Sequence, residues 1–101
     1  GVVELGAHNG LWAALLAERG CDVLALDLDP SGANVEFGTA ESLRALPHQT
    51  LFLCMPSPAE AGLAEDALDA FGGRRVAYVG EWRTGMTATA AFHRILARDY
   101  E

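Results

Sequence analysis

The sequence predicts an α/β domain built on a doubly wound, mostly parallel sheet with helices on both faces. Short apolar runs typical of buried strands alternate with stretches of helical periodicity, and turns rich in glycine or proline separate them. Half of the 101 residues are hydrophobic, which is enough for a packed core. We therefore expect residues 1–101 to form one domain.

Five apolar runs are the expected strands: residues 2–5, 21–28, 34–38, 50–55 and 75–80. The first and the fourth runs are the most apolar, so both are expected to lie at the centre of the sheet. Right-handed crossovers give the strand order 3-2-1-4-5, which reverses direction between the first and fourth strands. A ligand crevice is expected at that reversal, at the carboxyl ends of the strands.

The first helix is expected over residues 11–19, with Asn9 as its cap and Gly20 just past its end. Its apolar residues recur with helical spacing, so they should face the sheet. These are Leu11, Trp12, Leu15 and Leu16.

Three further helices are expected. A short one over residues 40–46 would follow Thr39. A longer one would begin at Ser57 and reach residue 71, because Ser57, Pro58 and Glu60 form a capping box. The last should start between Thr87 and Thr89 and bury three apolar side chains, Phe92, Ile95 and Leu96.

The turn between the first strand and the first helix has glycine at both ends, in G-A-H-N-G. A strand, a glycine turn and a helix form a nucleotide-sized pocket in many α/β domains. Gly6 and Gly10 would let the backbone approach a ligand where a Cβ would collide. His8 stands where a full G-x-G-x-G loop carries its middle glycine, and it is expected to be a solvated loop residue or a ligand contact.

Carboxylates recur at the carboxyl ends of four expected strands, as Glu4, Asp27, Glu41 and Glu81. An acid at the position of Asp27 can accept both hydroxyls of an adenosine ribose. Several acids on one rim suit a ligand with positive charge better than the pyrophosphate of NAD. No pair of residues qualifies as a catalytic acid and base, so the catalytic residues stay unassigned.

These motifs resemble those of the class I, Rossmann-like S-adenosylmethionine-dependent methyltransferases. E-L-G-A-H-N-G resembles their first motif, L-A-L-D-L-D the second, F-G-T-A-E-S-L the third and L-F-L-C-M-P-S-P the fourth. The later residues, with V-G-E-W, are also similar to a little-characterised methyltransferase-like group that carries C-x-P-P-P. The resemblance implies that S-adenosyl-L-methionine is held by Glu4, Gly6, Ala7, His8, Gly10, Asp27, Leu28, Ala40, Glu41 and Cys54.

The resemblance implies methyl transfer to an unidentified acceptor, either a small molecule or a protein. One alternative is a Rossmann-like module that has lost catalysis. Another, less favoured, is an NAD-type domain, because the G-x-G-x-x-G spacing is missing. The last two of the usual seven strands are absent, so we expect a piece of a longer chain. The sheet edge beside the fifth strand would then be exposed and could support oligomers.

Composition excludes several classes of partner. Seven Lys and Arg against fourteen Asp and Glu give a formal net charge of −7, which disfavours nucleic acid. No apolar run is long enough to span a membrane. Cys21 and Cys54 show no metal spacing, so no metal is expected, and a reduced, cytoplasmic chain is the simplest account. Cys54 has no histidine placed to activate it as a nucleophile. Trp12 is expected to anchor its helix or to line the cofactor pocket, and His48 and His93 are expected at the surface.

Overall fold

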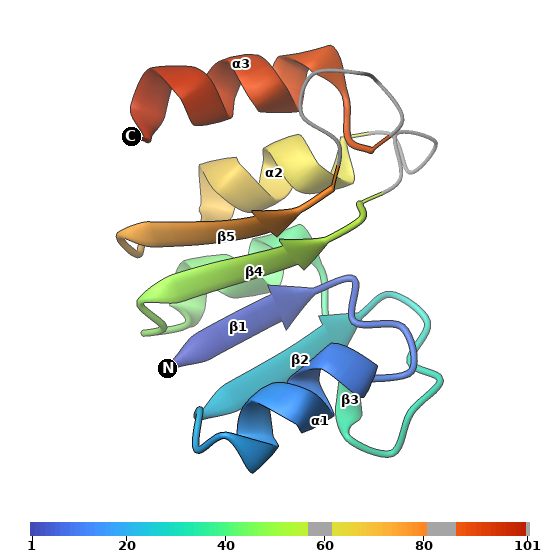
Figure 1. Ribbon diagram of the computed structural model, residues 1–101. Helices are drawn as coiled ribbons and strands as arrows, with labels where there is room; N and C mark the ends of the chain where they lie inside the picture. The colour runs from blue at the N-terminus through green and yellow to red at the C-terminus, as the bar shows by residue number, and fades with distance from the viewer. Residues whose placement is uncertain (57–61, 81–86, 101) are drawn as a thin grey trace.

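Five parallel strands form one sheet in the order β3-β2-β1-β4-β5 (Figure 1). The computed structural model describes residues 1–56, 62–80 and 87–100. The strands are β1 (Val2–Leu5), β2 (Val23–Asp27), β3 (Val35–Phe37), β4 (Thr50–Cys54) and β5 (Arg75–Val79). The predicted α/β class and strand order are confirmed, and so is the adjacent placement of β1 and β4 at the centre.

Helices lie on both faces of the sheet, as predicted (Figure 1). On one face, Ala13 of α1 (Leu11–Glu18) packs against Ala25 of β2. The opposite face carries the main core, where Val3 and Leu51 meet the 3₁₀ helix η1 (Ala40–Ala45), α2 (Leu63–Ala70) and α3 (Ala90–Asp99). This division follows from right-handed crossovers, because the direction of winding changes between β1 and β4.

The first helix buries only part of the predicted apolar face, since Leu15 and Leu16 are half-buried but Leu11 and Trp12 are exposed. Leu11 is 59% exposed and Trp12 46% exposed, and the buried residue of α1 is Ala13. A small side chain here lets the helix lie close to β2, where it faces Ala25. Leu11 and Trp12 belong to the first turn of α1, which follows the glycine turn at the carboxyl end of the sheet.

The two ends of α1 lie close to where the sequence predicts them, with Asn9 and Gly20 beside them. Gly10, with φ +82°, is the N-cap, while the Asn9 side chain accepts the Leu11 N–H at 3.2 Å. At the other end, Gly20 N–H donates to Ala17 and Cys21 N–H to Leu16, with φ +88° at Gly20. This is a Schellman motif with Gly20 in the predicted place past the helix.

The predicted helix over residues 57–71 is shorter in the structure. It begins at Leu63, with Gly62 at φ +80° as its N-cap, and ends at Ala70. The predicted capping box of Ser57, Pro58 and Glu60 lies outside the described residues. The short predicted helix over residues 40–46 is a 3₁₀ helix that stops at Ala45.

The last helix starts where the sequence predicts. Thr89 is its N-cap, and the Thr89 hydroxyl accepts the Phe92 N–H at 3.2 Å. Phe92 is fully buried, and Ile95 and Leu96 pack against the main core. His93 was expected at the surface, but it is 2% exposed and its ring lies against Tyr78. His93 directly follows Phe92 on the side of α3 that faces β5, so the helix turns the His93 ring inward.

Candidate functional site

The glycine loop, residues 6–10, joins β1 to α1 at the carboxyl edge of the sheet. Gly6 and Gly10 both have φ +82°, and His8 has φ +53°. Most of its amide groups already donate within the fold, and their acceptors include Leu26 O at 2.9 and 3.0 Å. The donors in the loop are the N–H groups of Gly6, Ala7, His8 and Gly10, and the N–H of Leu11, the first residue of α1, donates to Asn9 Oδ1. This loop therefore differs from a phosphate-binding loop, which points free N–H groups at its ligand.

Glu4 is a buried carboxylate in the third position of β1. It is 1% exposed, and no hydrogen-bond partner reaches its Oε1 among the described residues. Burial and, to a smaller extent, the charge of Asp27 raise the pKa of Glu4 to about 7. A buried carboxylate without a partner is unfavourable unless something in the site offsets it. Glu4 is thus positioned to receive a cation or a hydrogen-bond donor.

Asp27 ends β2 and holds two neighbouring segments. Its Oδ2 accepts the His8 N–H at 2.8 Å, and its Oδ1 accepts the Asp29 N–H at 2.9 Å. The side chain of Asp27 is 13% exposed, so one surface of the carboxylate remains accessible. Each carboxylate oxygen can accept a second hydrogen bond. Asp27 can therefore bind a hydroxyl pair while it fixes the glycine loop.

A small cavity of about 220 Å³ opens beside the glycine loop. The loop forms one wall, β1 and β4 the floor, and the first turn of α1 the other wall. The lining residues are Glu4, Gly6, Ala7, His8, Asn9, Leu11, Trp12, Cys54 and Met55. Here Trp12 meets Phe52 edge to face, with ring centroids 6.2 Å apart. Trp12 thus both contacts the sheet and lines the cavity.

Cys54 faces this cavity but is poorly suited to act as a nucleophile. Burial raises the pKa of its thiol, and the charge of Glu4 raises it further. A thiol with a raised pKa stays protonated near neutrality, whereas the thiolate is the reactive form. Both cysteines are free.

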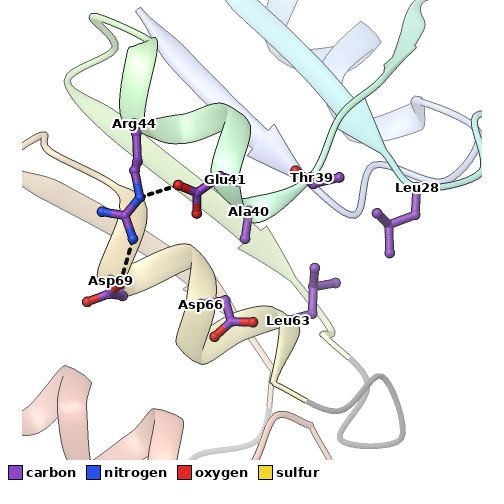
Figure 2. Close-up of a pocket in the computed structure, with 8 residues that line it drawn as sticks. All are labelled: Leu28, Thr39, Ala40, Glu41, Arg44, Leu63, Asp66 and Asp69. Carbon is purple, nitrogen blue, oxygen red and sulfur yellow. Dashed lines mark hydrogen bonds and ion pairs between the residues drawn. The ribbon is translucent and has the colours of Figure 1, made fainter.

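A larger cavity of about 650 Å³ lies between η1 and α2 (Figure 2). Its apolar end is formed by Leu28, Ala40 and Leu63, and Thr39 lies nearby. Its other end is charged, with Asp66 facing the cavity and Arg44 placed between Glu41 and Asp69. The end of β2 touches both parts of the site, since Asp27 binds the glycine loop and the next residue, Leu28, lines the larger cavity.

Arg44 joins η1 to α2 at the charged end. Its Nε donates to Glu41 Oε1 at 2.6 Å and its Nη2 to Asp69 Oδ2 at 2.8 Å. The hydrogen bonds to Asp69 and then Glu41 raise the pKa of Arg44. All three side chains are exposed, so these ion pairs are expected to contribute little to stability.

The structure divides the residues that the sequence singled out between the two cavities. Glu4, Gly6, Ala7, His8 and Cys54 line the smaller one. Leu28, Ala40 and Glu41 line the larger one. Asp27 lines neither cavity but holds the glycine loop through the His8 N–H, and Gly10 caps α1 without lining either. Glu81, and Trp82 of V-G-E-W, lie outside the described residues.

Sequence reasoning missed the contribution of α2. Leu63, Asp66 and Asp69 line the larger cavity from one side of that helix. Their i, i+3, i+6 spacing was the available signal, because it places them on one helical face. Met55, the last residue of the predicted fourth strand, follows β4 with φ +49° and is 54% exposed.

Comparison of the chain with family models, with curated proteins and with solved structures gives no match. Within residues 1–56, 62–80 and 87–100, no group of three or more His, Cys, Asp or Glu side chains could hold a metal ion. No helix in that part of the chain is long and apolar enough to cross a membrane.

Proposed function

We propose that this chain binds S-adenosyl-L-methionine across the two cavities and transfers its methyl group to an acceptor. The observation that carries the proposal is Glu4, a buried carboxylate in the wall of the smaller cavity whose Oε1 has no hydrogen-bond partner among the described residues. The α-ammonium group of the methionine moiety would supply the missing partner. A charged donor of this kind offsets the burial of a carboxylate better than a neutral one.

The remaining parts of the ligand match the other features of the site. Asp27 would accept the ribose hydroxyls between the two cavities. The apolar end of the larger cavity would take the adenine ring between Leu28, Ala40 and Leu63. The exocyclic amine of adenine could then reach an acid such as Asp66. The motif resemblance supports the same assignment.

Bound S-adenosylmethionine supplies a methyl group on a sulfonium that is already activated toward attack. The protein's own residues need only bind, orient and exclude water. Glu4 and Asp27 would hold the two polar parts, while Leu11, Trp12 and Met55 would line the approach to the smaller cavity. Such a reaction is compatible with a sequence in which no pair of residues is predicted to act as catalytic acid and base.

Two alternatives give different expectations. A catalytically inactive Rossmann-like module would bind the same ligand without turnover. The protonated thiol of Cys54 agrees with an inactive module as well as it does with a methyltransferase. An NAD-type domain is disfavoured, because most N–H groups of the glycine loop already donate within the fold. Glu4 would also repel a pyrophosphate.

The acceptor is proposed to be a small molecule or a protein. A net charge of −7 disfavours nucleic acid. The proposed setting is the cytoplasm, and copies of the chain may be tested for association through β5, which is an edge of the sheet.

Thermal unfolding with added ligands tests the binding step. S-adenosylmethionine and S-adenosylhomocysteine should each raise the melting temperature, whereas NAD should not. A ligand at ~100 times its dissociation constant stabilises by ~2.7 kcal/mol, which is a shift of several degrees in a domain of this size. A shift with NAD alone would overturn the proposal. Absence of any shift in the folded protein would overturn it as well.

Asp27 requires a careful choice of variant, because its carboxylate also holds His8 and Asp29. Asp27→Ala removes both roles at once. Asp27→Asn keeps one oxygen acceptor and the shape of the side chain, so it should retain more of the fold while weakening the ribose contact. The melting temperature without ligand reports the first role, and the ligand-induced shift reports the second. Equal shifts in Asp27→Asn and the unmodified protein would remove Asp27 from the ribose site.

A further inference from the structure

The outer side of the glycine loop is held by the connection between β2 and β3. The Asn34 side-chain amide donates from Nδ2 to the carbonyl oxygen of Gly10 at 3.1 Å. Ser31 N–H points at His8 O at 3.5 Å. Gly32 lies so close to Asn9 that a Cβ at Gly32 would collide with the Asn9 carbonyl. The connection therefore packs tightly against the second half of the loop.

The first half of the loop is fixed separately, by β2. Leu26 O accepts the N–H groups of Gly6 and Ala7, and Asp27 accepts that of His8. Gly10 has no such bond to β2. Its N–H donates to Ala7 within the loop, so the Asn34 side chain is the contact that ties Gly10 to the neighbouring segment.

Gly10 sets the direction of α1. It is the N-cap in a left-handed conformation, and its carbonyl oxygen also accepts the Ala14 N–H at 2.9 Å. The next two residues, Leu11 and Trp12, line the smaller cavity. A Cβ at Gly10 would collide with the Asn34 side chain, so the close approach of these residues requires glycine. A shift at Gly10 would therefore move a wall of the cavity.

We propose that Asn34 is a positioning residue, which fixes Gly10 and thereby shapes the smaller cavity for the amino-acid end of the ligand. This inference rests on the proposed function for its ligand, but the positioning itself is a property of the free protein. Asn34 lines neither cavity. Its effect must then pass through the loop and should spare contacts made by the adenosine part.

The test uses Asn34→Asp, which keeps the shape of the side chain but removes the donor to Gly10. Gln49→Glu is the matched control, since Gln49 is also exposed but lies next to β4 at the amino end of the sheet. Calorimetry with S-adenosylhomocysteine and with adenosine gives two affinities for each protein. Asn34→Asp should bind S-adenosylhomocysteine about 3- to 10-fold more weakly than the unmodified protein does, which is the effect of losing about one hydrogen bond. Its affinity for adenosine should stay within about twofold of that of the unmodified protein.

A general structural role would weaken both ligands equally, and that result would overturn the proposal. Unchanged binding of S-adenosylhomocysteine would also overturn it. Amide hydrogen exchange in the ligand-free protein provides a second measurement. Asn34→Asp should accelerate exchange at Gly10 and Ala14 several-fold and leave Leu53 of β4 unchanged.

Equal exchange rates at Gly10 and Ala14 in Asn34→Asp and in the unmodified protein would refute the positioning role, whether or not any ligand binds. If neither probe binds the unmodified protein, the proposed function fails, and the exchange result still decides the role of Asn34. The two failures are thus separable. Gln49→Glu should behave like the unmodified protein in every measurement.

Discussion

Replacing Glu4 with glutamine removes a charge from the centre of the sheet while keeping the shape of the side chain. In the folded protein the pKa of Glu4 is raised from 4.5 to about 7, first by burial and then by Asp27. Between these two pH values the folded chain retains a proton that the unfolded chain has released. Stability must therefore fall as the pH rises through this window and level off above about pH 7.

The size of this effect follows from the shift. Each pKa unit corresponds to about 1.4 kcal/mol, so the ionised form of Glu4 costs the fold about 3 kcal/mol at pH 8 relative to pH 4. Glu4→Gln should abolish that pH dependence and raise the free energy of unfolding at pH 8. Urea unfolding at several pH values measures both. Glu36→Gln, at an exposed position of β3, is the control and should leave the profile unchanged.

Ligand binding should show the opposite dependence on pH, because the proposed ammonium contact requires ionised Glu4. With a pKa near 7, about a tenth of Glu4 is ionised at pH 6 and about nine-tenths at pH 8. S-adenosylhomocysteine should thus bind about tenfold more tightly at pH 8, with release of a proton. Glu4→Gln should bind S-adenosylhomocysteine weakly at both pH 6 and pH 8. Equal affinities at the two pH values, together with unaltered binding by Glu4→Gln, would refute the proposed role of Glu4.

Two other substitutions address the loop and the core. His8→Gly should leave the affinity for S-adenosylhomocysteine unchanged or increase it, because glycine tolerates φ +53° and the His8 side chain is 73% exposed. Calorimetry measures this affinity. Weaker binding by the variant would instead identify His8 as a ligand contact. Phe92→Ala should destabilise the protein by about 3–5 kcal/mol, since Phe92 is fully buried, whereas Phe37→Ala, at a 69% exposed position, should change stability by less than about 0.5 kcal/mol. Urea unfolding distinguishes these, and equal losses would contradict the assigned core.

Local sequence signals were sufficient to predict the sheet. Parallel strands covered on both faces give continuous apolar runs, and their order follows from right-handed crossovers and short connections. Gly20 and Thr89 mark helix ends that the structure confirms. These features depend on residues close together in the chain, so a single sequence contains the information.

The buried face of α1 could not be predicted in the same way. Helical periodicity identifies an apolar stripe, but the partner surface decides which part of it is buried. On β2 that surface is Ala25, and the helix meets it through Ala13. Leu11 and Trp12 are left at the carboxyl edge, beside the smaller cavity. The prediction of the larger cavity was incomplete for a related reason, since Asp69 of α2 meets Arg44 of η1 from 25 positions further along the chain.

Glu4 is a carboxylate in the middle of a central strand, where the fold calls for an apolar residue, and such a departure points to a candidate site. An apolar residue in the middle of β1 would remove a penalty of about 3 kcal/mol, a large share of the 5–15 kcal/mol by which domains are stable. Its neighbours Val3 and Leu5 follow the apolar pattern of a central strand. No hydrogen-bond partner from the described residues reaches Glu4 Oε1, which agrees with the proposed contact to a bound ammonium group. Under the proposed function, the acid in V-V-E-L is therefore the residue at which stability and ligand binding make opposite demands.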